Sequence, residues 1–124
     1  MAVNHNRVIE EIVPRLNIEK FDIYTNPSQE KNAGIGDNYP DVILTDKGGK
    51  TVKFIMEVET ADSVTSEESV KQWKKYFSEI NATFYLVVPV TLLNKAKELC
   101  QKEDINARYT TYFEKNGELI FEFQ

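Results

Sequence analysis

The chain has 124 residues, of which 41% are hydrophobic and 28% are charged, a composition typical of one globular domain with its own core. Its single cysteine, Cys100, and single histidine, His5, exclude an internal disulfide, a thiolate zinc site and a multi-histidine metal site. The net charge of −5 argues against a broadly basic nucleic-acid-binding surface but leaves room for a local basic patch. Residues 1–14 contain no apolar run of signal-peptide or membrane-span length. We therefore expect a cytoplasmic protein with a single domain over residues 1–124 and no contact with membranes.

The first third of the chain predicts a helix, a strand and a loop. Apolar residues recur at helical spacing between Val3 and Glu19, and Pro14 should bend or interrupt this helix. The segment FDIYT, residues 21–25, reads as a short strand. Residues 26–38 are dense in Gly, Asn, Pro and Ser, which indicates a loop. A loop of this length is typical of a functional or mobile segment.

The next segment predicts a hairpin with arms 39–46 and 50–60 around Gly48-Gly49. Alternation divides its side chains between two faces. A strict two-residue turn would place Asp41 opposite Met56 and mix the faces, so we expect a three- or five-residue turn or a glycine bulge. Asp41 would then lie opposite Ile55 or Glu57. One face would carry Val42, Leu44, Val52, Phe54, Met56 and Val58, and the other would carry Asp41, Lys53, Glu57 and Glu59.

The second half of the chain predicts two crossovers and a closing hairpin. Thr65 and Glu68 form a capping box at the start of a helix that runs to about residue 79. Residues 82–90, ATFYLVVPV, are typical of a central strand buried on both faces, and Thr91 should cap the next helix. Strands 107–113 and 118–123 follow around Asn116-Gly117. The order α-β-β-β-α-β-α-β-β indicates an α/β fold with a mixed sheet flanked by helices and parallel strands across each crossover.

The predicted hairpin gathers three carboxylates, from Asp41, Glu57 and Glu59, at one end of one sheet face. A charge inside a sheet is costly unless it meets water or a cation. Converging carboxylates are how proteins hold Mg²⁺ or Mn²⁺, which prefer oxygen ligands. Such a metal activates water and neutralises charge on a phosphate during hydrolysis.

These residues resemble a known family, the PD-(D/E)xK nuclease superfamily. Pro40-Asp41, then Glu57-Val58-Glu59 sixteen residues later, are similar to its catalytic motif, and Gln72 and Tyr76 are similar to its QxxxY element. The likeness covers roughly residues 3–113. It implies a restriction-endonuclease-like fold in which Asp41 and Glu57 bind Mg²⁺ or Mn²⁺, Gln72 and Tyr76 orient the site, and a DNA phosphodiester is hydrolysed.

One position departs from the motif, because Glu59 stands where the family has its lysine. Glu59 would then act as a third metal ligand or as the base for water. The missing positive charge would come from Lys53, or from Lys71 or Lys75, which are our candidate phosphate contacts. The alternative is a catalytically inactive nuclease-fold module that serves DNA or protein binding. Because the net charge is −5, we expect a homodimer or a larger partner to complete the DNA-binding surface.

Each of these residues also has an ordinary structural interpretation. Asp41 and Glu59 could be solvated strand ends, and Glu57 could pair with Lys53 on an exposed face. Gln72 and Tyr76 could cover the edge of the core. Trp73 could be a core residue. His5 could be structural or exposed, and the sequence gives it no evident partner. The charged residues that could simply lie on the solvated surface are Lys71, Lys75, Glu10 and Glu11.

Overall fold

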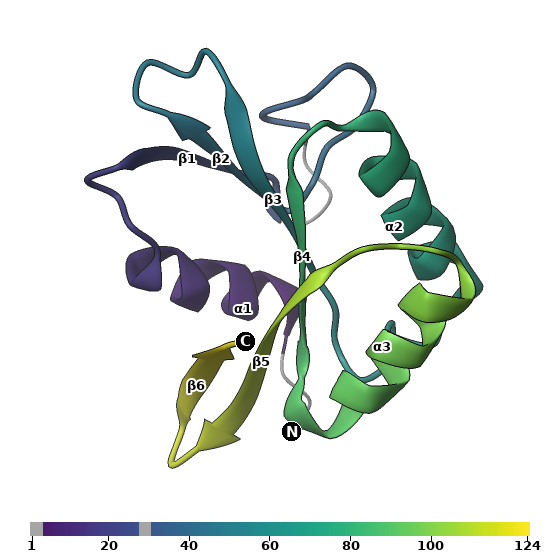
Figure 1. Ribbon diagram of the computed structural model, residues 1–124. Helices are drawn as coiled ribbons and strands as arrows, with labels where there is room; N and C mark the ends of the chain where they lie inside the picture. The colour runs from purple at the N-terminus through teal and green to yellow at the C-terminus, as the bar shows by residue number, and fades with distance from the viewer. Residues whose placement is uncertain (1–3, 28–30) are drawn as a thin grey trace.

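A computed structural model describes residues 4–27 and 31–124 of the chain. It contains one mixed, curled, six-stranded sheet whose strands lie side by side in chain order (Figure 1). Strand β3 is parallel to β4 and β4 is parallel to β5, whereas the other neighbours are antiparallel. This confirms the predicted α/β class and element order. The strands are β1 Phe21–Thr25, β2 Val42–Asp46, β3 Val52–Val58, β4 Thr83–Pro89, β5 Arg108–Lys115 and β6 Glu118–Phe123.

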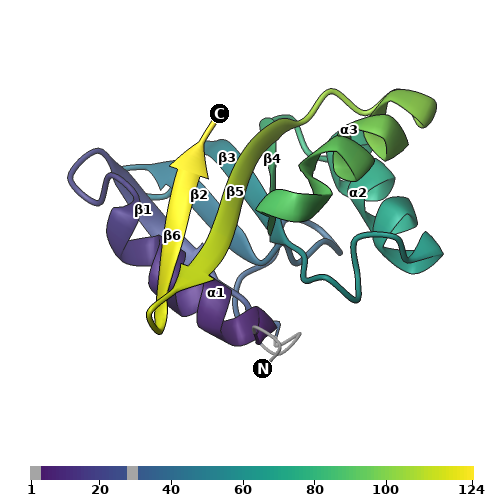
Figure 2. The same cartoon turned by 90° about the horizontal axis from the view of Figure 1, so that it is seen from below.

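Helices cover both faces of the sheet. Both crossovers step the same way, from β3 to β4 and from β4 to β5, and crossovers of one hand then place their helices on one face. Accordingly α2 and α3 lie together on one side and α1 lies on the other, as the two views show (Figures 1 and 2). Each side has its own core. The helices are α1 His5–Ile12, α2 Glu67–Glu79 and α3 Leu93–Lys102.

The first helix is shorter than the predicted span of 3–19, whose first residue lies outside the described residues. Helix α1 ends at Ile12, and Val13–Arg15 form a 3₁₀ turn, η1. Pro14 explains the change, because it lacks the N–H that an α-helical turn would use. At the other end Asn4 caps the helix by accepting a hydrogen bond from the Asn6 N–H.

The hairpin between β2 and β3 reaches the predicted register by a different route. Thr45 pairs with Val52, whereas Leu44 pairs with Phe54, so Lys53 is an extra residue that forms a bulge. The turn itself has four residues, 47–50, closed by the Asp46 N–H donating to the Thr51 carbonyl. The expected three- or five-residue turn or glycine bulge is therefore wrong in its details. The bulge also moves Val52 to the α2 and α3 face and leaves Lys53 exposed.

Two predicted helix caps are one residue out of place, and the last hairpin is correct. Ser66, and not Thr65, caps α2, because its side chain accepts from the Ser69 N–H. A 3₁₀ turn, η3 Val90–Leu92, precedes α3, so Thr91 does not cap that helix. Asn116 and Gly117 both have positive φ, of 53° and 81°, as a two-residue hairpin turn requires.

No described helix is long and apolar enough to cross a membrane.

Candidate carboxylate site

Two carboxyls are held together where β2 begins and β3 ends. Asp41 precedes β2, and the register of Val42 opposite Met56 sets Asp41 opposite Glu57. The Asp41 N–H donates to Glu57 Oε1 at 3.0 Å, and the Val58 N–H donates to Asp41 Oδ2 at 2.8 Å. The backbone thus fixes both carboxyls at this strand end. Within the described residues these bonds engage one oxygen of each carboxyl.

His5, the first residue of α1, joins this pair. Its Nε2 lies 3.1 Å from Asp41 Oδ2, a hydrogen bond in which the ring nitrogen donates to the carboxylate. The hydrogen bond to Asp41 raises the pKa of His5, and the nearby negative charges add to this effect against the opposing effect of burial. The expectation that His5 has no partner is therefore wrong. Sequence reasoning missed it because α1 and β2 meet only through the tertiary fold.

Glu57 is the most strongly perturbed carboxyl of the site. Although it is a carboxyl, it is only 4% exposed and belongs to a sheet face of apolar side chains. Burial raises the pKa of Glu57 well above its ordinary value, and the charges of Asp41 and Glu59 raise it further, whereas the Asp41 N–H opposes them. Within the described part of the chain, no lysine or arginine forms an ion pair with any of these three acids. Among the described residues, His5 beside Asp41 is therefore the one basic side chain paired with these acids.

Glu59 is buried beside the other two acids but is held from α2. Trp73 Nε1 donates to Glu59 Oε1 at 3.3 Å. Burial raises the pKa of Glu59, and hydrogen bonds from Ser63, Trp73 and Ser69 oppose that shift. Trp73 is fully buried, so its predicted core position is confirmed. Its polar contact with Glu59 was not foreseen, although a buried indole N–H usually finds a partner.

The two residues of the QxxxY element contact each other. Gln72 Nε2 donates to the Tyr76 hydroxyl at 2.8 Å. Tyr76 is buried and Gln72 is exposed. Burial raises the pKa of Tyr76, and the negative charge of Glu57 raises it further. Gln72 therefore contacts the hydroxyl of Tyr76, and the negative charge of Glu57 acts on that same group.

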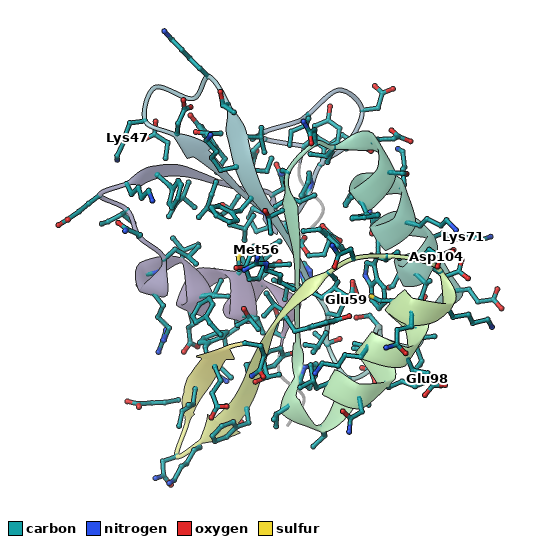
Figure 3. All side chains as sticks on the ribbon, in the orientation of Figure 1. Lys47, Met56, Glu59, Lys71, Glu98 and Asp104 are labelled. Carbon is teal, nitrogen blue, oxygen red and sulfur yellow. The ribbon has the colours of Figure 1, made fainter. Side chains whose placement is uncertain are left out.

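The other charged candidates lie farther from the acids. Lys71 and Lys75 lie two residues before and two residues after the buried Trp73 of α2, and both are exposed. Figure 3 shows Lys71 on the outer side of that helix, away from Glu59. On α1, Glu11 accepts from Arg7 Nε at 2.6 Å and Glu10 is exposed. The surface interpretation of both glutamates fits these positions.

The loop before Asp41 is anchored by Asn26, which the sequence did not single out. The Asn26 amide donates to the carbonyls of Ala33 and Pro40 at 2.8 and 2.7 Å, and its Oδ1 accepts from the backbone N–H groups of Asn32 and Ala33. The Asn26 N–H donates to the Asp41 carbonyl. One buried side chain therefore ties the loop to the position of Asp41.

We expect Asn26→Ala to lower the free energy of unfolding by about 2 kcal/mol, because several buried backbone groups lose their partner. Amide hydrogen exchange should accelerate mainly in residues 31–41. Asn32→Ala is the matched control, since among the described residues its side chain makes one long hydrogen bond, to the Thr25 carbonyl at 3.4 Å. Equal acceleration in both variants would contradict an anchoring function for Asn26.

Asp41 and Glu57 carry the oxygen donors that a hard divalent cation prefers. Among residues 4–27 and 31–124, no group of three or more His, Cys, Asp or Glu side chains is arranged to hold a metal ion. Mg²⁺ commonly takes only one or two carboxylates and completes its shell with waters and substrate phosphates. The all-oxygen donors of Asp41 and Glu57 match that preference, with Glu59 close behind them.

The stability of the metal-free protein should depend on the titration of Glu57. The pKa of Glu57 is raised in the folded protein, so folding favours the protonated carboxyl. The contribution of this group to the free energy of unfolding is therefore complete below its ordinary pKa and is lost as pH rises through the folded pKa. We expect Glu57→Gln, which keeps the acceptor oxygen, to be more stable than the wild type at pH 7 by about 1–2 kcal/mol. Urea unfolding in a chelator should show this gap closing near pH 4. A gap that does not change with pH would contradict the assignment.

Comparison of the chain with protein-family models, curated proteins and solved structures found no match. The functional assignment therefore depends on the geometry of the carboxylates and on the motif resemblance.

Proposed function

We propose that the protein is a metal-dependent nuclease of the PD-(D/E)xK type that hydrolyses DNA phosphodiesters. The observation that carries the proposal is the buried pair Asp41 and Glu57, fixed by backbone hydrogen bonds and left without a lysine or arginine partner in the described residues. Structural carboxylates are usually paired when buried. Strongly perturbed carboxyls that gather at one place are instead typical of functional sites.

In this proposal each residue has a defined task. Asp41 and Glu57 would bind Mg²⁺ or Mn²⁺, and Glu59 would supply the third negative charge. A bound metal of this kind would activate water and stabilise charge on the phosphate. His5 holds the Asp41 carboxylate in place, and Gln72 sets the hydroxyl of Tyr76.

The binding surface and the location belong to the same proposal. Lys71 and Lys75 would contact DNA phosphates away from the cleaved bond, and a homodimer or larger partner would extend the surface. A cytoplasmic location fits the single cysteine, Cys100. The restriction-endonuclease-like identity of the fold also remains part of the proposal.

A second candidate function is an inactive nuclease-fold module that binds DNA or protein. One observation favours it: Glu59 stands at the position of the motif lysine, and its carboxyl accepts from Trp73. In this alternative Glu59 is a buried structural acid. The acids would then be retained for the fold and not for catalysis.

A cleavage assay with metal titration tests the proposal. Linear, branched and single-stranded DNA would be incubated with Mg²⁺ and then Mn²⁺, and calorimetry would follow Mn²⁺ binding to the protein alone. We expect metal-dependent cleavage and Mn²⁺ binding that is lost in Asp41→Asn. Mn²⁺ binding without cleavage would favour the binding module. If the protein neither binds Mn²⁺ nor cleaves DNA, the proposed metal site is wrong.

A further inference from the structure

A second feature lies at the carboxyl ends of the three parallel strands. The segments that follow β3 and β4 meet β5 there and enclose a hollow of about 200 Å³. The hollow is lined by Thr60, Ala61, Asp62, Pro89, Val90, Thr91, Tyr112 and Phe113.

The hollow adjoins the carboxylate site. Thr60 follows Glu59 directly in the chain, and the Glu59 N–H donates to the carbonyl of Val87 in β4 at 2.8 Å. Tyr112, which lines the hollow, donates its hydroxyl to the Glu59 carbonyl at 2.7 Å. The two features therefore share the backbone of Glu59.

The walls combine exposed apolar side chains with polar groups. Val90 is 42% exposed and Phe113 is 36% exposed, and both lie outside the two core clusters. Single exposed apolar residues are common on protein surfaces, but here two of them line the same hollow. Asp62, Thr60 and Thr91 add a carboxylate and two hydroxyls. An aliphatic ligand would leave these polar groups unused.

We propose that this hollow is a nucleobase subsite for an unpaired nucleotide of the DNA substrate, with a preference for a base that carries an exocyclic amine. A base offers apolar faces for Phe113 and Val90, and stacking on an aromatic side chain stabilises such complexes. The Asp62 carboxylate accepts hydrogen bonds from amino groups, which cytosine, adenine and guanine have and thymine lacks.

The subsite rests on the proposed function and narrows its substrate class. A base inside a duplex is stacked on both faces, so it must leave the helix before it can enter the hollow. The substrate is therefore single-stranded DNA, or a fork or flap with unpaired nucleotides. Intact duplex DNA does not fill the subsite.

Amide NMR spectra of the metal-free protein test the inference without any cleavage. Short oligocytidylate and oligothymidylate strands would be titrated separately. We expect oligocytidylate to shift the amides of Thr60–Asp62, Thr91 and Phe113, and oligothymidylate to bind about tenfold more weakly. Phe113→Ala should weaken oligocytidylate binding about tenfold, and Asp62→Asn should remove the preference between the two strands.

Phe123→Ala is the matched control, because Phe123 is 48% exposed but lines a different hollow. Shifts confined to other surfaces, or equal weakening by both phenylalanine variants, would overturn the subsite. A concentration-dependent dimer that Phe113→Ala abolishes would assign the hollow to a second copy and would also overturn it. A parallel cleavage assay separates the two proposals. Cleavage without these shifts would support the nuclease and refute the subsite. These shifts without cleavage would support a nucleobase-binding hollow and refute the nuclease.

Discussion

Replacing Glu57 with glutamine is expected to reduce metal-dependent DNA cleavage by about a thousandfold or more, an effect of the size seen when a catalytic group is removed. Glutamine retains the oxygen that accepts from the Asp41 N–H, so the strand end should keep its geometry. What is lost is the negative charge that would bind and orient the metal. Single-turnover cleavage with saturating Mg²⁺ and then Mn²⁺ would measure the effect.

Glu10→Gln is the matched control for this experiment. Glu10 is exposed on α1, so the variant changes the net charge equally without touching the carboxylate pair. It should cleave at the rate of the wild type. If Glu57→Gln, purified in the same way, also cleaves at that rate, the activity belongs to a contaminant or to another site, and the proposed function of Glu57 is wrong.

Replacing Trp73 should have the largest effect on stability. The side chain is fully buried, and truncation to alanine would leave a large cavity and remove the indole partner of Glu59. We expect Trp73→Ala to lower the free energy of unfolding by about 3–5 kcal/mol. Trp73→Phe keeps much of the apolar contact but loses the N–H, so it should cost about 1–2 kcal/mol. Urea unfolding at neutral pH would measure both.

A double-mutant cycle separates the hydrogen bond from simple packing. Glu59→Gln would be combined with Trp73→Phe, and the four proteins would be unfolded under identical conditions. If the indole supports the Glu59 carboxylate, Glu59→Gln will have a more favourable effect in the Trp73→Phe background than in the wild type. An identical effect in both backgrounds would reduce Trp73 to a core residue.

The sequence predicted those features that depend on local pattern. Alternation in β2 and β3 was enough to place Asp41 opposite Ile55 or Glu57, of which the structure has Glu57, and helical spacing on α2 placed Trp73 toward the core. Asn116-Gly117 identified the last hairpin because its backbone requires positive φ. The α/β order followed from the same patterns, since each element carries its own period.

The remaining features depend on contacts between distant segments. His5 meets Asp41 across 36 positions in the chain, and Asn26 binds Pro40 through its side chain; neither pairing leaves a periodic signal. The exchange of Thr65 for Ser66 as the cap of α2 reflects two adjacent hydroxyl residues that can both cap a helix, of which serine is the more favourable. The position of the bulge at Lys53 was not predictable, because a regular strand and a bulged strand have the same composition.

That bulge decides which residue of β3 lies opposite Asp41. Strand side chains alternate with a period of two, and the register shifts by one position at the bulge, from Thr45 opposite Val52 to Val42 opposite Met56. If Lys53 instead paired in a regular ladder running on from Thr45 and Val52, Asp41 would lie opposite Met56. One of the two acids would then have to turn toward the helix α1 side of the sheet. The bulge leaves Lys53 out of the pairing, so deleting Lys53 should straighten the strand and keep Asp41 opposite Glu57.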